Sequence, residues 1–291
     1  MEFVAQMING LSTGGMYALV AIGYTMVYGI GKMINFAHGE IIMVGAYLAY
    51  VGSSMMGLPV IASVLMSIIG CAILGTVIEK VAYKPLRNSG SLAVLITAIG
   101  VSYLLQNLFL ILFGSAAKTF PSYIPSGTMR LFGISISYVS LLSLVLTFVC
   151  AGSLLLFINK TRVGKAMRAV SEDKGAAELM GINVNHTISL AFIIGSGLGA
   201  IAGIIYGMSY SLIDPYLGAM LGIKAFIAAV LGGIGEIRGA VVGGLIIGVA
   251  EAFTISYVSS TFSDAVVFGI LIFILLVKPA GLFGRNVREK V

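Results

Sequence analysis

The stretch TISLAFIIGSGLGAIAGIIYGMSYS, residues 187–211, decides how the rest of the sequence is interpreted. It contains no Asp, Glu, Lys or Arg from its first residue to its last. About 20 consecutive apolar residues are enough for a helix to cross the hydrocarbon core of a bilayer. The stretch therefore predicts a membrane-spanning helix.

The composition extends this interpretation to the whole chain. Of the 291 residues, 59% are hydrophobic and only 10% are charged, and the mean hydropathy is +1.07. A soluble domain carries about a quarter charged residues and has too little interior to bury so many apolar side chains. The 38 glycines stand among Leu, Ile and Val, which fits close helix packing in a membrane rather than disorder.

The sequence predicts an all-α, polytopic bundle of eight to ten spans that forms a single membrane domain over residues 1–291. The candidate spans lie near 4–30, 40–57, 59–78, 91–114, 136–158, 187–211, 219–234, 239–257 and 263–278. Glycine-rich breaks around 31–39 and 232–239 are candidates for broken or re-entrant helices at corresponding positions of an inverted repeat.

Basic residues indicate how the chain is oriented. Three clusters hold 12 of the 17 Lys and Arg residues: Lys80, Lys84 and Arg87; Lys160, Arg162, Lys165, Arg168 and Lys174; and Lys278, Arg285, Arg288 and Lys290. The positive-inside rule places all three in the cytoplasm, with the C-terminus, and even numbers of candidate spans separate them. Three candidates precede the first cluster, which predicts an external N-terminus. The same rule explains the net charge of +6 without a nucleic-acid partner.

The longest external segment is about 115–135 and contains Pro121, Pro125, Gly127 and Gly133, which favour turns. It is either a lid or docking surface for an external partner, or a simple connector.

One long hydrophilic loop, KTRVGKAMRAVSEDKGAAELMGINVNH (160–186), stands out in a chain that has few. Ser171, Glu172 and Asp173 are good helix-start residues, and Gly181 is a natural stop. We therefore predict a short helix at the membrane surface, over roughly 172–180. From the residues alone, an ordinary amphipathic connector is the alternative.

A few polar side chains fall in or beside apolar segments, where they either line a pathway or pair with one another. Asn35 and His38 are three residues apart and would share a face of a helical turn, with Glu40 close by. The alternative is that they cap helix ends at the interface. The remaining candidates for the translocation path are Gln106, Asn107, Lys224 and Glu251.

Each of these candidates has a structural interpretation. Gln106 and Asn107 either contact a substrate or hydrogen-bond neighbouring helices. Lys224 either snorkels to the surface or pairs with a carboxylate inside the bundle. Glu251 is the best candidate for a buried functional carboxylate, and structural pairing is at least as good an explanation.

The sequence carries no signature of its own catalysis. It has no G-x-x-x-x-G-K-[ST] phosphate loop, G-x-S-x-G elbow, H-E-x-x-H helix or Cys-x-x-Cys pair, so we expect no catalytic residue, cofactor or bound metal. His38 has no second ligand set around it. Cys71 and Cys150 lie in apolar segments and are expected to pack there.

Four stretches carry a resemblance that covers essentially the whole chain. They are ALVAIGYTMVYGIGKMINFAHGEIIMVGAY (18–47), EKVAYKPLR (79–87), ITAIGVSYLLQN (96–107) and IKAFIAAVLGGIGEIRGAVVGGLIIGVAE (223–251). They resemble the branched-chain amino acid permeases of ATP-binding-cassette (ABC) importers. The run Ala176-Ala177-x-x-x-Gly181 is similar to the cytoplasmic loop of such permeases, although Gly175 stands where Glu is common.

This resemblance implies a bacterial inner-membrane importer that moves Leu, Ile and Val by alternating access. Its partners would be a second homologous permease subunit, two cytoplasmic ATPase subunits and an external substrate-binding protein. The residues that would couple to the ATPase are Glu172, Asp173, Ala176, Ala177, Gly181, Ile182 and Asn183. A bulky charge at Ala177 or Gly181 is expected to stop transport without unfolding the protein.

Three other functions remain open from the sequence. Urea and short-amide permeases of the importer family look alike. An ion-coupled secondary transporter would need a carboxylate that titrates during transport, with Glu251 as the obvious choice. A membrane enzyme acting on lipid would need a concentrated polar constellation, and only the region from Asn35 to Glu40 comes near one.

Overall fold

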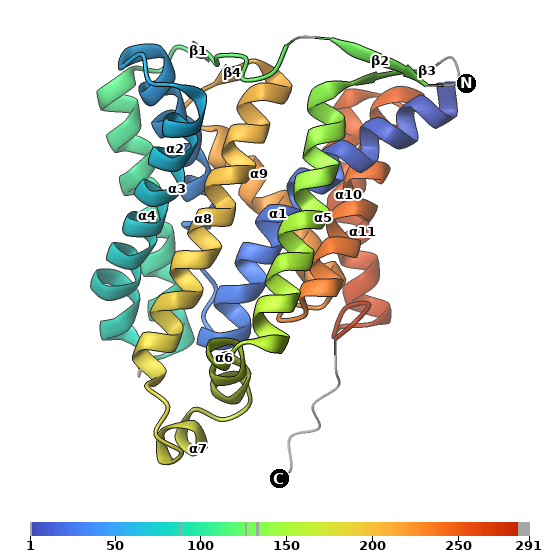
Figure 1. The fold of residues 1–291 in the computed structure, drawn as a ribbon. Coiled ribbons are helices and arrows are strands. Elements are labelled where there is room, and N and C mark those ends of the chain that lie inside the picture. The colour runs from blue at the N-terminus through green and yellow to red at the C-terminus, as the bar shows by residue number, and fades with distance from the viewer. Residues whose placement is uncertain (1, 88, 126, 132–133, 285–291) are drawn as a thin grey trace.

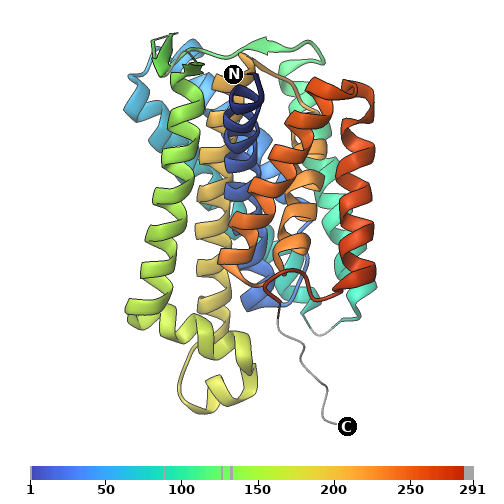
Figure 2. The same ribbon diagram turned by 90° about the vertical axis from the view of Figure 1, so that its right-hand side faces the viewer.

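The computed structural model describes residues 2–87, 89–125, 127–131 and 134–284. Its long helices stand side by side in one bundle (Figures 1 and 2). α1 starts at one end of this bundle, and a helical hairpin projects from the other, which we call the hairpin end (Figure 1). Arg285, Arg288 and Lys290 of the third basic cluster, and Gly133 of the external segment, lie outside the described residues.

Among the residues that the structure describes, nine helices make up the bundle, and each overlaps one of the predicted spans. They are α1 (Glu2–Gly31), α2 (His38–Tyr50), α3 (Val60–Ile78), α4 (Ser91–Phe113), α5 (Tyr138–Lys160), α8 (Val184–Tyr210), α9 (Leu217–Gly232), α10 (Ile237–Tyr257) and α11 (Ser263–Val277). Among the described residues, seven helical segments are long and apolar enough to cross a membrane, and α2 and α9 are shorter. The predicted all-α polytopic fold is confirmed.

Glycines bring the central helices together. A Cβ on Gly14 of α1 would lie 2.8 Å from the carbonyl oxygen of Gly244 on α10, and one on Gly10 would lie 2.7 Å from Cα of Val249. Membrane helices associate by such close packing of small residues, because lipid provides no hydrophobic drive between them. The outer helices instead expose apolar side chains, such as Ile111 on α4 and Leu276 on α11, as a lipid-facing surface requires.

Two helices are interrupted in the same way. Lys32 directly follows α1 and Ser211 directly follows α8, with φ of 56° and 57°, and these are the non-glycine residues with positive φ in the described part of the chain. Six residues later a short helix begins in each case, at His38 and at Leu217. The second residue of each short helix is glycine, and a Cβ on Gly218 would lie 2.5 Å from the carbonyl oxygen of Gly39.

The two short helices therefore begin side by side in the interior, as expected for an inverted repeat with broken helices. The break at 31–39 is confirmed, but its structural counterpart is 211–216 rather than the predicted 232–239. The latter segment is the turn between α9 and α10, where the Gly233 N–H donates to the carbonyl oxygens of Ala229 and Val230.

The hairpin consists of α6 (Arg162–Glu172) and α7 (Lys174–Leu179). Thr161 Oγ1 caps α6 by accepting from the Gly164 N–H at 2.9 Å, and Asp173 Oδ1 caps α7 by accepting from the Ala176 N–H at 2.9 Å. The single predicted helix over 172–180 is thus only partly right: Asp173 separates two helices, and α6 was not predicted.

The remaining elements are short. The helical turns are η1 (Val51–Met55), η2 (Glu79–Tyr83), η3 (Lys84–Leu86) and η4 (Ser260–Phe262), and the strands are β1 (Lys118–Thr119), β2 (Thr128–Leu131), β3 (Ile134–Ser137) and β4 (Leu212–Ile213). β1 pairs antiparallel with β4, so the segment 115–135, predicted to be external, is tied to the second break. The Tyr123 hydroxyl also donates to the Ala49 carbonyl oxygen at 2.8 Å, which anchors the segment on α2.

Candidate functional site

Three of the predicted polar residues lie deep in the bundle, where the first break meets α2. Asn35, His38 and Glu40 are all buried. Asn35 Oδ1 accepts from the Tyr83 hydroxyl at 2.9 Å, and the His38 ring packs edge-on against Tyr24 at 4.8 Å between centroids. Asn35 lies outside α2, in the turn that leads into it, where the His38 N–H donates to the Asn35 carbonyl oxygen at 3.0 Å. The two residues therefore share a turn, but not a face of α2.

Several polar atoms in this region have no hydrogen-bond partner among the described residues. They are Thr25 Oγ1, Asn35 Nδ2, both ring nitrogens of His38, and Glu40 Oε2. Native proteins satisfy most buried polar atoms with protein or water partners, so the unsatisfied atoms gathered here mark a place where a water molecule or a ligand can supply them. Within the described part of the chain, no three His, Cys, Asp or Glu side chains gather as a metal site would require.

A cavity of about 190 Å³ opens beside Glu40. Its polar lining comes from Tyr24, Glu40, Ser102 and Gln106, and Gly218 and Gly222 of α9 form part of its wall. The structure thus brings two predicted residues, Glu40 and Gln106, to the same cavity. Ser102 was not predicted, and its hydroxyl donates to Glu40 Oε1 at 3.1 Å.

Asn107 follows Gln106 in the chain but does not line this cavity. Its side chain is exposed, and Nδ2 donates to the carbonyl oxygen of Tyr103 at 2.8 Å. Successive residues of a helix point in different directions, so only one of the two can face the cavity.

Lys224 and Glu251 form a separate cluster with Asp264. Lys224 Nζ lies 2.6 Å from Glu251 Oε1 and 2.8 Å from Asp264 Oδ1. The hydroxyls of Tyr17 and Ser263 donate to Glu251 at 2.5 and 3.2 Å. Of the two alternatives for Lys224, snorkelling to the surface or pairing with a carboxylate inside the bundle, the structure shows the pairing. Asp264 was not predicted as a partner of Lys224, because no local sequence pattern shows that the first turn of α11 faces this cluster.

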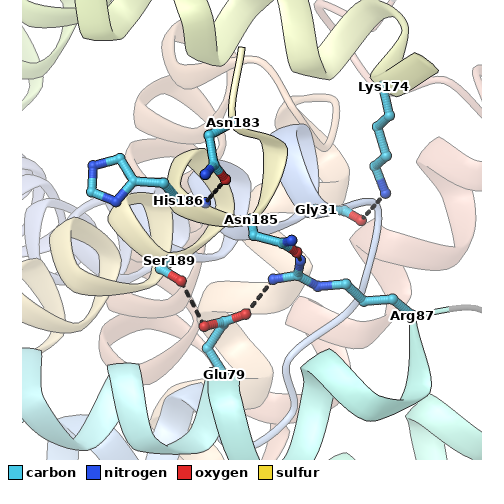
Figure 3. A network of polar contacts seen from close by, with 8 residues as sticks. All are labelled: Gly31, Glu79, Arg87, Lys174, Asn183, Asn185, His186 and Ser189. Carbon is cyan, nitrogen blue, oxygen red and sulfur yellow. Dashed lines mark hydrogen bonds and ion pairs between the residues drawn. The ribbon is translucent and has the colours of Figure 1, made fainter. Parts of the chain in front are cut away.

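At the hairpin end of the bundle, a polar network joins η2 and the adjacent Arg87 to the start of α8 (Figure 3). Glu79 is fully buried; Oε1 pairs with Arg87, and Oε2 accepts from the Ser189 hydroxyl at 2.7 Å. Arg87 also donates to Asn185 Oδ1 at the start of α8. Arg87 belongs to the first predicted basic cluster, but its partner Asn185 lies far along the chain and was not predicted.

Lys174 connects the hairpin itself to the first break. Its Nζ donates to the Gly31 carbonyl oxygen at 2.9 Å, at the end of α1 (Figure 3). The pKa of Lys174 is lowered, mainly because the side chain is partly buried and to a smaller extent because the cations Arg87 and Lys32 lie nearby. A displacement of α7 would therefore act directly on the point where α1 is broken.

The predicted coupling residues occupy the hairpin in different ways. Glu172 ends α6, Asp173 caps α7, and Ala176 is exposed. Ala177 is buried, and its carbonyl oxygen accepts from the Ile182 N–H at 3.0 Å. Gly181 has φ of 79°. Asn183 Oδ1 caps α8 by accepting from the His186 N–H at 2.9 Å (Figure 3).

These positions change the expected effect of substitutions in the loop. A bulky charge at Ala177 would enter a packed site, and a side chain at Gly181 would be strained at positive φ, so both changes would disturb the hairpin itself. The most exposed large apolar side chains of the hairpin are Leu179 and Met180, which are 91% and 82% exposed at its tip. Neither was predicted, because their exposure depends on how α7 packs.

Comparisons with known proteins show that the chain is similar to a family of transport permeases. Residues 6–275 match the family model described as "Branched-chain amino acid transport system / permease component". The chain is 46% identical to the high-affinity branched-chain amino acid transport system permease protein BraD of Pseudomonas aeruginosa, covering 100% of this chain and 98% of the relative. It is 45% identical to the corresponding LivH protein of Escherichia coli K12, with 99% and 98% covered.

More distant similarity extends to archaea and to a solved structure. The probable branched-chain amino acid transport permease protein LivH of Methanocaldococcus jannaschii is 30% identical, with 91% of this chain and 88% of the relative covered. A chain of PsaBC from Streptococcus pneumoniae, solved in complex with Fab, matches with a TM-score of 0.50 and 16% identity, covering 94% of this chain and 92% of that one. At this identity the likeness shows the fold alone.

Proposed function

Because this chain belongs to the family of branched-chain amino acid transport permease components, we propose that it is the membrane subunit through which a separate ATPase drives import of leucine, isoleucine and valine. The observation that carries the proposal is the similarity over the full length of the chain to permeases of this substrate class. The bundle of membrane-spanning helices with a projecting hairpin supports it (Figure 1).

The chain depends on a motor for this task, since its sequence contains no phosphate-binding loop. The hairpin is the place where a motor would act: α7 is short, lies beyond the bundle, and presents Leu179 and Met180 outward. Lys174 and Asn183 connect its two ends to α1 and α8. The two helices that are broken in the interior are thus the ones that the hairpin can pull.

We assign the hairpin end to the cytoplasm of a bacterial inner membrane. Arg87 and Lys174 meet the same end of the bundle as α6, and Lys278 follows α11 at that end (Figure 1). This concentration of basic residues is the pattern of the positive-inside rule. The start of α1 and the strand pair β1–β4 then face outward, where a binding protein would deliver the substrate.

Transport by alternating access follows from these assignments. Closure of two ATPase subunits would move the docked hairpins, and the broken helices would change the side to which the interior opens. A second permease subunit would complete the path. The similarity to permeases named for branched-chain amino acids favours this function over a urea permease, an ion-coupled transporter or a lipid enzyme.

The hairpin assignment is tested with Leu179→Asp, which places a charge on the exposed tip without entering the packed side of α7. ATPase subunits expressed with the permease are expected to co-purify with the unaltered chain and not with the variant, because a charge must be desolvated at a docking site. Val258→Asp is the matched control: Val258 is also an exposed apolar residue, but it lies beyond α10 at the opposite end. Equal co-purification of both variants would contradict the assignment.

A further inference from the structure

Glu40 differs from a buried structural carboxylate in two respects: one of its oxygens has no hydrogen-bond donor among the described residues, and its side chain borders a cavity. Oε1 accepts from the Ser102 hydroxyl, whereas Oε2 has no partner among the described residues. The residue is only 1% exposed, and it lines the 190 Å³ cavity. A buried carboxylate oxygen without a donor is costly, so this arrangement calls for a donor that the chain itself does not provide.

Glu40 lies close to the N-terminal ends of two helices. The residue lies in the first turn of its own helix, α2. Its Oε2 also lies 2.8 Å from the place that a Cβ on Gly218 would occupy, in the first turn of α9. The positive ends of two helix dipoles therefore face this carboxylate. The ion pairs between described residues join Arg87 to Glu79 and Lys224 to Glu251 and Asp264, and none of them involves Glu40.

We propose that Glu40 binds the ammonium group of an amino acid as it crosses the membrane. The inference rests on the proposed function and gives it a defined binding site. An ammonium group offers three N–H donors and the opposite charge, which is what the free oxygen lacks. An uncharged amide or urea would supply no charge, so the site selects for solutes that carry an ammonium group.

The rest of the cavity matches such a ligand. Phe36, Ile99 and Ile223 provide an apolar wall for a branched side chain, while Tyr24 and Gln106 add polar groups to the lining. Its volume is below the ~300–1,000 Å³ of pockets for drug-sized ligands, as suits a small solute. Gly218 and Gly222 of α9 complete the wall, and the absence of side chains there lets α9 approach Gly39 of α2 closely.

The direct test is ligand protection of a cysteine in the cavity. Gln106→Cys in the assembled transporter is labelled with a small methanethiosulfonate in liposomes without ATP. At a leucine concentration about ten times the Kd, mass action leaves about a tenth of the sites free, so labelling should slow about tenfold. Leucinamide, which keeps the ammonium group, should also protect. 4-Methylpentanoate, which is leucine without that group, should not.

The matched control is Asn107→Cys, at the adjacent residue that faces away from the cavity, whose labelling leucine should leave unchanged. Adding Glu40→Gln to Gln106→Cys should abolish protection, whereas Glu40→Asp should keep part of it. If Gln106→Cys does not fold, Ile223→Cys on the opposite wall replaces it. Protection that survives Glu40→Gln, or protection by 4-methylpentanoate equal to that by leucine, would overturn the assignment of Glu40.

Uptake separates this inference from the proposed function on which it rests. The same liposomes are supplied with ATP and with binding protein carrying leucine. Absence of ATP-driven uptake with the unaltered chain would count against the proposed function. Normal uptake there, together with unchanged leucine uptake by Glu40→Gln, would overturn the Glu40 site alone. We expect uptake by Glu40→Gln to fall about tenfold or more, as when a charge-assisted hydrogen bond is lost.

Discussion

Two buried carboxylates in this bundle, Glu251 and Glu40, have opposite surroundings. Glu251 has a cation at 2.6 Å and accepts from two hydroxyls, so both of its oxygens are satisfied. Glu40 has one hydroxyl donor and no cation among the described residues, one of its oxygens has no donor there, and its side chain borders a cavity. Burial alone does not distinguish them. The partners do: a satisfied carboxylate ties helices together, and an unsatisfied one is available to a ligand.

Glu79 belongs with Glu251 in this comparison. It is fully buried, and Arg87 and Ser189 occupy both of its oxygens. It therefore joins η2 to α8 at the hairpin end, and we expect its contribution to be structural. Stability measurements on the three carboxylates should separate Glu251 and Glu79 from Glu40.

The largest loss of stability is expected for Lys224→Met, which removes the cation and leaves Glu251 with hydroxyl partners only. Breaking a buried ion pair from one side costs about 3–5 kcal/mol, because the remaining charge stays buried. Thermal unfolding of the purified protein in detergent should show a clearly lower Tm. If the Tm of Lys224→Met equals that of the unaltered chain, the Lys224–Glu251 ion pair does not stabilise the fold, and the contrast with Glu40 fails.

Arg87→Ala should have the next largest effect. It leaves Glu79 buried with Ser189 as its remaining side-chain partner, at a cost of about 3 kcal/mol, the low end of the range for a broken buried ion pair, because Arg87 makes one ion pair and Lys224 makes two. Because Arg87 also bonds Asn185, hydrogen exchange at the start of α8 should increase in this variant. Exchange that is unchanged there, with an unchanged Tm, would show that the network in Figure 3 does not hold the hairpin end together.

Ser102→Ala removes the hydroxyl that donates to Glu40. The expected cost is about 1 kcal/mol, the ordinary size for one hydrogen bond, and the same unfolding assay measures it. Ser153→Ala is a suitable control, since the Ser153 hydroxyl only bonds the Cys150 carbonyl oxygen on the same helix. A cost as large as that of Lys224→Met would mean that Glu40 depends on Ser102 as Glu251 depends on Lys224.

The smallest effect on stability is expected for Glu40→Gln. The substitution keeps the shape and removes a charge that no cation in the described structure compensates, so the Tm should change by less than the equivalent of about 1 kcal/mol. Leucine uptake by the same preparation should nevertheless fall. A large drop in Tm would place Glu40 among the structural carboxylates.

Much of the fold could be predicted because a bilayer imposes a length on each apolar segment. All nine predicted spans coincide with helices, and Gly31–Gly39 marks the first break correctly. The second break was misplaced because glycine guided the prediction: 232–239 is rich in glycine and forms a turn, whereas the break at 211–216 begins with Ser211 at positive φ. Only the contact between Gly39 and Gly218 shows which breaks correspond.

The candidate site was predictable residue by residue but not in its pairings. Polar residues in apolar segments identified Glu40, Gln106, Lys224 and Glu251. Which of them meet depends on contacts between distant segments, such as Ser102 with Glu40 or Asp264 with Lys224, and no local pattern encodes these. In the hairpin, composition identified α7, but only its packing shows that Ala177 is covered.

The most direct test of the central claim is leucine uptake into proteoliposomes that contain this chain with its second permease subunit and ATPase subunits, with leucine-loaded binding protein outside. We expect uptake that requires ATP inside the vesicles, does not respond to a proton or sodium gradient, and disappears with Leu179→Asp. Uptake driven by an ion gradient without ATP would contradict the account.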